Sequence, residues 1–283
     1  MKKLILFIFL GCLVVFYACS KDLEPNDKTA ELYLEYKDSP GAEFHPEYKD
    51  LPDSRKTKSD KSEANNGSVS PNAEKTVYLT FDDGPTSATT DILDTLHQFN
   101  AKATFFMLEP SMRESPEVVD KIVEQGHAVG LHGVTHDINH FYKSEQSALK
   151  EITTAQETLQ QITGVRSNLI RTPYGSVPYL TKSYREVLDS NGFKLWDWNV
   201  DSRDWSLSSD QYLDTVIGQI EELVNAGVIP IILMHDKQNT ADHLSILLTY
   251  LSEHGFQTKK IEENIQPYNF NCYQRCYRLS TQE

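Results

Sequence analysis

Apolar positions from about residue 73 onward form short runs that alternate with longer helical patterns. A short apolar run precedes His132, and others predict buried strands at 75–81, 103–108, 168–171, 193–198 and 228–234. Between them, apolar residues recur at helical spacing, as at Ile92, Leu93, Leu96 and Phe99. Strands alternating with helices indicate βα units around a parallel sheet or barrel.

Helix boundaries are predicted by residues that start or stop helices. Ser115 and Pro116 suit a helix start, and other apolar helical faces end at or before Gly126, Gly164, Gly227 and Gly255. Counting strand and helix pairs gives about seven units. We therefore predict an α/β fold, a distorted (β/α) barrel of about seven units, preceded by a signal segment and a disordered tether.

The first 18 residues have the pattern of a bacterial export signal. Two lysines precede an apolar run over 4–17, which is shorter than the roughly 20 residues that cross a membrane. The Ala18-Cys19 junction resembles the lipobox of bacterial lipoproteins, so we expect lipidation of Cys19 and a membrane anchor facing the periplasm or the cell exterior. Phe16 replaces the usual Leu of that box, which leaves secretion after ordinary cleavage, or an uncleaved anchor, as alternatives.

Composition divides the rest of the chain into three parts. Residues 19–72 are polar, charged and rich in proline, so they cannot bury enough apolar surface to offset ordering entropy and are predicted to be a flexible linker. The functional domain is expected over 73–265, followed by a C-terminal tail over 266–283. Cys272 and Cys276 in that tail could form a disulfide or remain free thiols.

Net charge limits the partners. The 283-residue chain carries a formal charge of -14, which would repel nucleic acids and anionic lipid surfaces. We therefore expect no nucleic acid partner and a neutral or partly cationic ligand.

Two adjacent carboxylates, Asp82 and Asp83, follow the first strand, and Gly84-Pro85 breaks the strand there. Consecutive residues of a strand point to opposite faces, so the two acids can share a site only if the backbone turns at this point. Taken alone, such a sequence is common in ordinary turns.

His132 and His136 follow the third strand at a spacing of four. On a helical turn this spacing brings both imidazoles to one face, and two histidines with a carboxylate can form a three-ligand catalytic metal site. A solvated surface pair is the alternative, since His127 and His140 show that histidine is frequent in this region.

Three more polar clusters follow later strands, at 171–175, 201–205 and 233–236. In parallel α/β folds the carboxyl ends of the strands meet at one edge, where chemistry collects. Five such clusters therefore predict a single shared site.

These clusters, in this order, resemble the motifs of the polysaccharide deacetylase family, the NodB-homology or carbohydrate esterase family 4 domain, over about 75–257. The resemblance implies that Asp82 is the catalytic base and that Asp83, His132 and His136 bind a divalent metal. Zinc is expected, with cobalt, nickel or manganese as alternatives.

The resemblance assigns the remaining roles residue by residue. It implies that Arg171 orients the base, that the Tyr174 backbone N–H faces the oxyanion, and that Asp204 orients the catalytic His235. Trp205 and Leu233 would line the pocket for the acetyl methyl. Asp201 is the other candidate for the orienting acid. Two departures from the family pattern are Gly133, where Ser or Thr is usual, and Thr172, where Pro is common.

The expected reaction is metal-dependent hydrolysis of N-acetyl groups on a polysaccharide, first of all the N-acetylglucosamine residues of peptidoglycan, with release of acetate. Three alternatives are an O-acetyl esterase acting on xylan-type polysaccharide, a glycosidase using paired carboxylates, and a catalytically inactive carbohydrate-binding domain. A glycosidase would leave the histidine pair unexplained.

Overall fold

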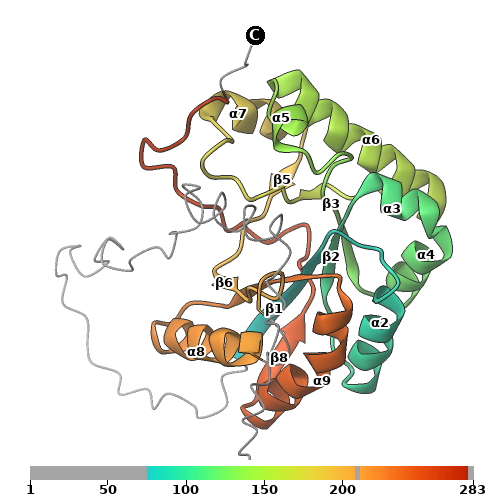
Figure 1. Cartoon of the computed structure of the whole chain (residues 1–283), viewed down its shortest axis with the longest axis vertical. Coiled ribbons are helices and arrows are strands. Elements are labelled where there is room, and N and C mark those ends of the chain that lie inside the picture. The colour runs from blue at the N-terminus through green and yellow to red at the C-terminus, as the bar shows by residue number, and fades with distance from the viewer. Residues whose placement is uncertain (1–74, 208–210, 280–283) are drawn as a thin grey trace, which may run out of the picture. The chain divides into compact units, whose positions relative to one another are not determined.

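The protein has an α/β fold, seen in a computed structural model that describes residues 75–207 and 211–279. Seven strands form a curled parallel sheet in the order β5-β4-β3-β2-β1-β7-β6, and β8 pairs in parallel with the start of β1 (Figure 1). The strands are β1 (Lys75–Asp82), β2 (Thr104–Met107), β3 (Ala128–Leu131), β4 (Leu169–Ile170), β5 (Lys194–Leu195), β6 (Val200–Asp201), β7 (Ile231–His235) and β8 (Phe256–Lys259).

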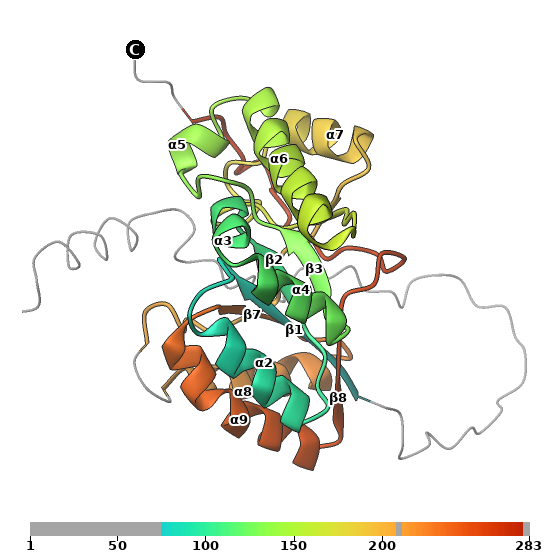
Figure 2. The same ribbon diagram turned by 90° about the vertical axis from the view of Figure 1, so that its right-hand side faces the viewer.

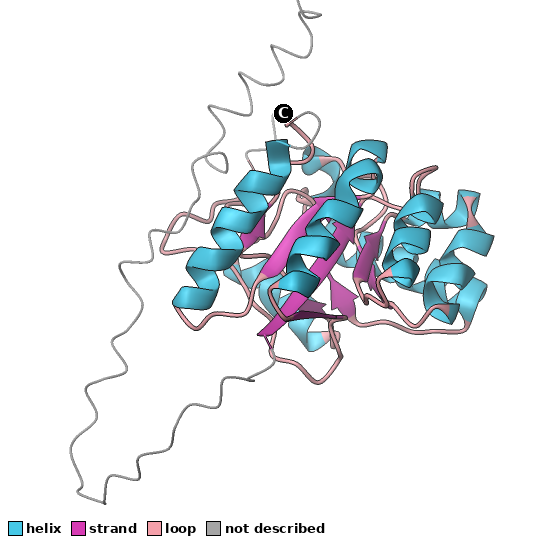
Figure 3. Cartoon of the chain, turned by 90° about the horizontal axis from the view of Figure 1, so that it is seen from below, coloured by secondary structure: helices cyan, strands magenta, loops and turns pink. Residues whose placement is uncertain are grey.

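Helices lie between the strands in sequence and outside the sheet in space (Figure 3). Helix α2 lies alongside α9, and α4 packs against α6 (Figure 2). The helices are α2 (Thr89–Gln98), α3 (Glu109–Glu114), α4 (Pro116–Glu124), α5 (Ile138–Phe141), α6 (Glu145–Thr163), α7 (Lys182–Ser190), α8 (Gln211–Asn225) and α9 (Gln238–Glu253).

The sheet is a half-barrel. Strands β5 and β6 stand at the two ends of the strand order and do not pair with each other within the described residues. This confirms the predicted distorted barrel and shows where it stays open.

The two faces of the sheet bury different residues, as strand alternation requires. In β1, Val77, Leu79 and Phe81 belong to the large hydrophobic core, whereas Tyr78 belongs to a smaller inner cluster. That inner cluster also contains Phe106, Leu169, Trp196, Ile231 and Ile261. Alternation therefore directs Thr80 and Asp82 toward the inner, concave face.

Close packing on the inner face explains why residue 130 is a glycine. A side chain at Gly130 in β3 would overlap the Phe106 ring and approach the Leu169 carbonyl oxygen to 3.2 Å. Glycine at this position therefore lets the aromatic ring of the neighbouring strand fill the concave face.

Residues 266–279, part of the predicted tail, contact the domain at several points. The Asp197 backbone N–H donates to the Tyr268 carbonyl oxygen, and the Phe270 N–H donates to the Asp197 carboxylate at 2.7 Å. Cys272 and Cys276 form a disulfide. The domain boundaries at 73 and 265 stay predictions.

The predicted signal segment over 1–18 and linker over 19–72, with the lipidation site Cys19, lie outside the described residues. Within 75–207 and 211–279, no helix combines the length and apolar character needed to cross a membrane.

Candidate active site

The chain turns sharply at Asp83, which brings two consecutive carboxylates into one site. Asp83 has a φ of 72°, in the left-handed region. Asp82 Oδ2 and Asp83 Oδ1 lie 3.9 Å and 3.4 Å from the same atom, His132 Nε2. The next residue must be small, because a side chain at Gly84 would overlap the buried Asp236 carboxylate. The turn required by the sequence argument is therefore present.

His132 and His136 lie on a loop, not on the helical turn that their spacing suggested. Positive φ angles at Gly133 (94°) and His136 (46°) fold this loop so that the two rings lie 5.2 Å apart. The predicted proximity is confirmed and the predicted local geometry is wrong, because the turn depends on left-handed residues that helical spacing does not foresee.

The orientation of His132 suits a metal ligand. Its Nδ1 lies 2.7 Å from the Arg171 carbonyl oxygen, an acceptor, so Nδ1 carries the proton and Nε2 presents a lone pair. That Nε2 faces Asp83, and the His136 Nε2 lies 3.4 Å from the same Asp83 oxygen.

Asp83, His132 and His136 fit a divalent cation. One ligand atom from each lies within 4.8 Å of the others, and Asp83 Oδ1 is buried without a hydrogen-bond partner among the described residues. Burial acts to raise the pKa of Asp83, but the neighbouring His132 and His136 outweigh it and the pKa is lowered. Burial and His132 lower the pKa of His136, which favours the neutral imidazole that binds metal.

Arg171 holds Asp82 on the concave face. This fully buried guanidinium donates from its Nη1 atom to Asp82 Oδ1 at 2.8 Å and to Thr80 Oγ1 at 2.7 Å. It also donates to the carbonyl oxygens of Trp196 and Asp197 and lies 4.3 Å from the centre of the Phe106 ring. Asp82 is therefore fixed by one oxygen, with the other facing the histidines.

Asp204, rather than Asp201, is the partner of His235. Asp204 Oδ1 lies 2.8 Å from His235 Nδ1, and its Oδ2 accepts from the His235 backbone N–H at 2.7 Å and from Thr240 Oγ1 at 2.6 Å. Asp201 instead accepts from the Arg203 backbone N–H. The structure thus distinguishes the two candidates left open by the sequence.

The Asp204 contact changes how His235 titrates. Burial acts to lower the pKa of His235, but the hydrogen bond and negative charge of Asp204 outweigh it, and the pKa is raised. Burial acts to raise the pKa of Asp204, yet the same contact with His235 lowers it. The pair therefore favours a protonated His235, suited to general acid catalysis.

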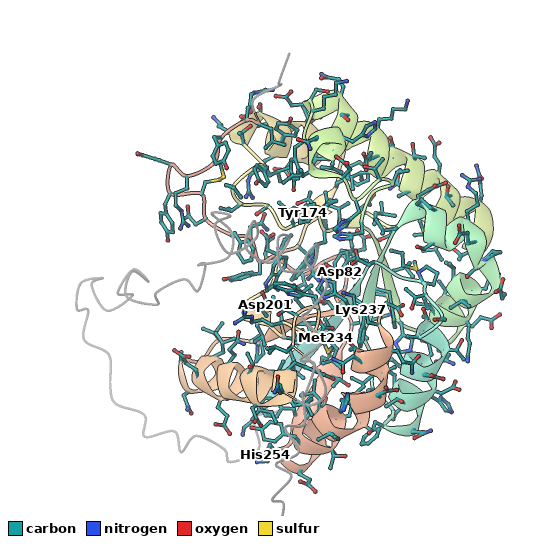
Figure 4. The ribbon with its side chains drawn as sticks, viewed as in Figure 1. Asp82, Tyr174, Asp201, Met234, Lys237 and His254 are labelled. Carbon is teal, nitrogen blue, oxygen red and sulfur yellow. A yellow bond between two sulfur atoms is a disulfide. The ribbon has the colours of Figure 1, made fainter. Side chains whose placement is uncertain are left out.

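Asp82, the candidate metal ligands and His235 meet at one edge of the sheet. Asp82 of β1 and His235 of β7 are opposite each other in the strand register. Figure 4 shows Asp82, Tyr174 and Asp201 near this edge, whereas His254 lies at the far end of α9. Residues from strands far apart in the sequence therefore share one site.

The three residues expected to contact the acetyl group differ in burial and in the element that carries them. Tyr174 is 48% exposed, has a φ of 63°, and donates its hydroxyl to the His136 carbonyl oxygen at 3.1 Å. Leu233 is buried in β7, two residues before His235 and therefore on the same face of the strand. Trp205 is half-buried in the turn after β6.

His127 and His140 are placed apart from the metal ligands. His127 is buried, its Nδ1 accepts from the Ala103 backbone N–H at 3.2 Å, and burial lowers its pKa to about 4. His140 Nδ1 lies 2.9 Å from Glu151. Thr240 and Glu151, which support site residues, carried no sequence signal, because their partners are distant in the chain.

Comparison with known proteins agrees with this geometry. The family profile described as polysaccharide deacetylase matches residues 70–196. YheN of Bacillus subtilis, named for the same family, is 45% identical over 196 residues, which cover 69% of this chain and 70% of YheN. This chain belongs to the polysaccharide deacetylase family.

Two further matches are to proteins of Bacillus cereus, one from its sequence and one from a crystal structure. A peptidoglycan-N-acetylglucosamine deacetylase is 36% identical over 201 residues, which cover 69% of this chain and 73% of that protein. The crystal structure of the polysaccharide deacetylase Bc1974 matches with a TM-score of 0.63 at 36% identity and covers 69% of this chain and 97% of that one. The protein is thus a polysaccharide deacetylase with an Asp-His-His group able to hold a metal.

Proposed function

We propose that this polysaccharide deacetylase hydrolyses the N-acetyl groups of N-acetylglucosamine residues in peptidoglycan and releases acetate. The observation that carries the proposal is the convergence of Asp82, the Asp83-His132-His136 group and the His235-Asp204 pair at one edge of the sheet. The peptidoglycan-N-acetylglucosamine deacetylase relative at 36% identity supports the choice of glycan.

Asp83, His132 and His136 would hold the cation, for which we propose zinc. A bound divalent cation supplies a Lewis acid, which polarises a carbonyl oxygen and makes water more acidic. Asp82 would serve as general base: Arg171 fixes its Oδ1, and its Oδ2, which lies 3.9 Å from His132 Nε2, would accept the proton of the attacking water.

His235 is the proposed general acid. An amide nitrogen leaves readily only when it gains a proton. The hydrogen bond and charge of Asp204 raise the pKa of His235 against the opposing effect of burial, so the ring keeps its proton to a higher pH than an ordinary histidine. Asp204 also fixes the ring, because it contacts both the side chain and the backbone N–H of His235.

The remaining residues would bind the acetyl group. The Tyr174 backbone N–H is proposed to stabilise the oxyanion, and the left-handed φ of this residue sets the loop around it. Leu233, on the same strand face as His235, and Trp205 would enclose the methyl group. An apolar enclosure of this kind selects acetyl over larger acyl groups.

We also propose that lipid attached at Cys19 anchors the protein outside the cytoplasm, facing the periplasm or the cell exterior. The Ala18-Cys19 junction supports this. Cys19→Ser should release the protein from the membrane fraction and abolish labelling by a radioactive fatty acid. A Cys19→Ser protein that stays labelled and membrane-bound would rule out this anchor.

The substrate is tested with metal-free protein resupplied with Zn²⁺. Acetate and free amine are measured from peptidoglycan, from N-acetylglucosamine oligomers and from acetylated xylan. Equal amounts of acetate and new amine from peptidoglycan are expected. Acetate from xylan alone would instead identify an O-acetyl esterase, and no acetate from any of them would favour an inactive carbohydrate-binding domain.

A further inference from the structure

Glu151 of α6 is a buried carboxylate close to the metal-binding histidines but is not one of the three ligands. Only 4% of the residue is exposed. A buried carboxylate is costly unless several donors satisfy it. Among the described residues, its hydrogen-bond partners are Val134 and Thr135, inside the His132–His136 loop, and His140, just after it.

Both oxygens of Glu151 are used. Oε2 accepts from the backbone N–H groups of Val134 and Thr135 at 3.0 and 3.1 Å. Oε1 accepts from the Thr135 hydroxyl at 2.7 Å and lies 2.9 Å from His140 Nδ1. The two backbone donors stand between His132 and His136, so a single side chain holds the centre of the loop.

Gly133 makes this arrangement sterically feasible. Its φ of 94° lies in the region that side chains disfavour, and a Cβ at this position would be 3.0 Å from Glu151 Oε2 and 3.3 Å from the Phe141 ring. The space that a side chain would fill lies against the Glu151 carboxylate and the Phe141 ring.

We propose that Glu151 is a positioning residue that holds the His132–His136 loop in its cation-binding shape. Without the carboxylate, the N–H groups of Val134 and Thr135 lose their acceptor and the loop can relax. The two imidazoles then no longer face Asp83 together. The inference rests on the proposed function, because it assigns Glu151 to the same metal site.

The test is the affinity of the metal-free full chain for Zn²⁺ and Co²⁺, measured for Glu151→Gln, Glu151→Ala and Thr135→Val. The matched control is Glu157→Gln, which changes an exposed glutamate of the same helix. Loss of a group that bonds a metal ligand directly weakens binding by about 10- to 100-fold. Glu151 bonds the backbone between the two ligands, so we expect a loss at the lower end, about 10-fold, for Glu151→Ala. Smaller losses are expected for Glu151→Gln and Thr135→Val, and none for Glu157→Gln.

Two further measurements distinguish a residue that positions the metal-binding loop from a residue that only stabilises the fold. The visible spectrum of bound Co²⁺ should change in Glu151→Gln, and the rise in Tm that saturating Zn²⁺ gives should shrink. A purely structural glutamate would lower the Tm of the metal-free protein and leave cation affinity unchanged, which would overturn the inference. If Glu151→Ala does not fold, a cation affinity equal to wild type in both Glu151→Gln and Thr135→Val would also overturn the inference.

The outcomes also separate this inference from the proposed function. Weaker binding by the Glu151 variants, in a protein that releases no acetate, would support the inference and contradict the function. A wild-type protein that binds neither cation would overturn both.

Discussion

At the scale of single residues, the site depends on backbone angles that the sequence does not reveal. Asp83, His136, Tyr174 and Arg203 all have positive φ without being glycine, and they lie in the loops around the site. Non-glycine residues rarely adopt such angles, and those that do concentrate at functional sites. The sequence therefore predicted which side chains meet, but not the turns that bring them together.

The choice between Asp201 and Asp204 shows the same limit. Both follow the fifth predicted strand, three positions apart, and either could have oriented His235. Only the position of β7 beside β6 shows that Asp204 reaches both His235 and Thr240.

The His235-Asp204 pair yields a prediction about pH. His235 acts in its protonated form, so activity should fall as pH rises through its pKa, which Asp204 raises against the effect of burial. Asp204→Asn removes the negative charge, and the alkaline limb of the kcat/KM profile should move to lower pH. Asp189→Asn, at an exposed position of α7, is the control and should keep the wild-type profile. An alkaline limb that stays in place in Asp204→Asn would contradict the assigned acid.

At the scale of elements, long amphipathic segments were predictable, whereas the short elements β6 and α5 were not. Helix α6 ends at Gly164, which has a φ of 74°, as its apolar face and terminal glycine indicated. Strand β6 has two residues, and α5 has four. Segments this short carry no measurable period, and β6 exists because Val200 and Asp201 pair with β7.

Two glycines should respond in opposite ways to alanine. Gly130→Ala would force a methyl group against the Phe106 ring, and we expect a loss of about 1–3 kcal/mol in the free energy of unfolding. Gly218 is exposed within α8 with no atom near its added Cβ, so Gly218→Ala should gain up to about 1 kcal/mol. Urea denaturation measures both. A Gly130→Ala protein as stable as wild type would show that the concave face is less tightly packed than described.

At the scale of the whole molecule, the strand order explains why the prediction of a barrel was right and incomplete. Apolar patterning indicated parallel βα units, but whether β5 meets β6 depends on the curvature of the assembled sheet. Patterning also does not reveal that the predicted C-terminal tail contacts the domain. Residues 268–270 contact the buried Asp197, whose carboxylate also accepts from the Ser176 backbone and hydroxyl groups.

Removal of the predicted tail should therefore destabilise the domain. Truncation after Ile265 deletes Phe270, which donates to Asp197 and packs against Trp198 at a ring distance of 4.9 Å. We expect a loss of at least about 2 kcal/mol, because a buried carboxylate loses a donor and an aromatic contact is lost. Replacing Cys272 and Cys276 with Ser keeps both contacts and should cost less. Equal unfolding midpoints for truncated and intact protein would show that these contacts contribute little.

We propose that Asp82 and the Asp83-His132-His136 group together hydrolyse acetyl groups on a glycan. The most direct measurement is acetate release from peptidoglycan by Zn²⁺-resupplied wild type and Asp82→Asn, with Zn²⁺ binding measured in the same samples. We predict that Asp82→Asn still binds Zn²⁺ but loses at least about 100-fold in rate, the contribution typical of a general base. The exposed Asp94→Asn is the control and should match wild type. Wild-type acetate release by zinc-loaded Asp82→Asn would show that Asp82 is not the general base.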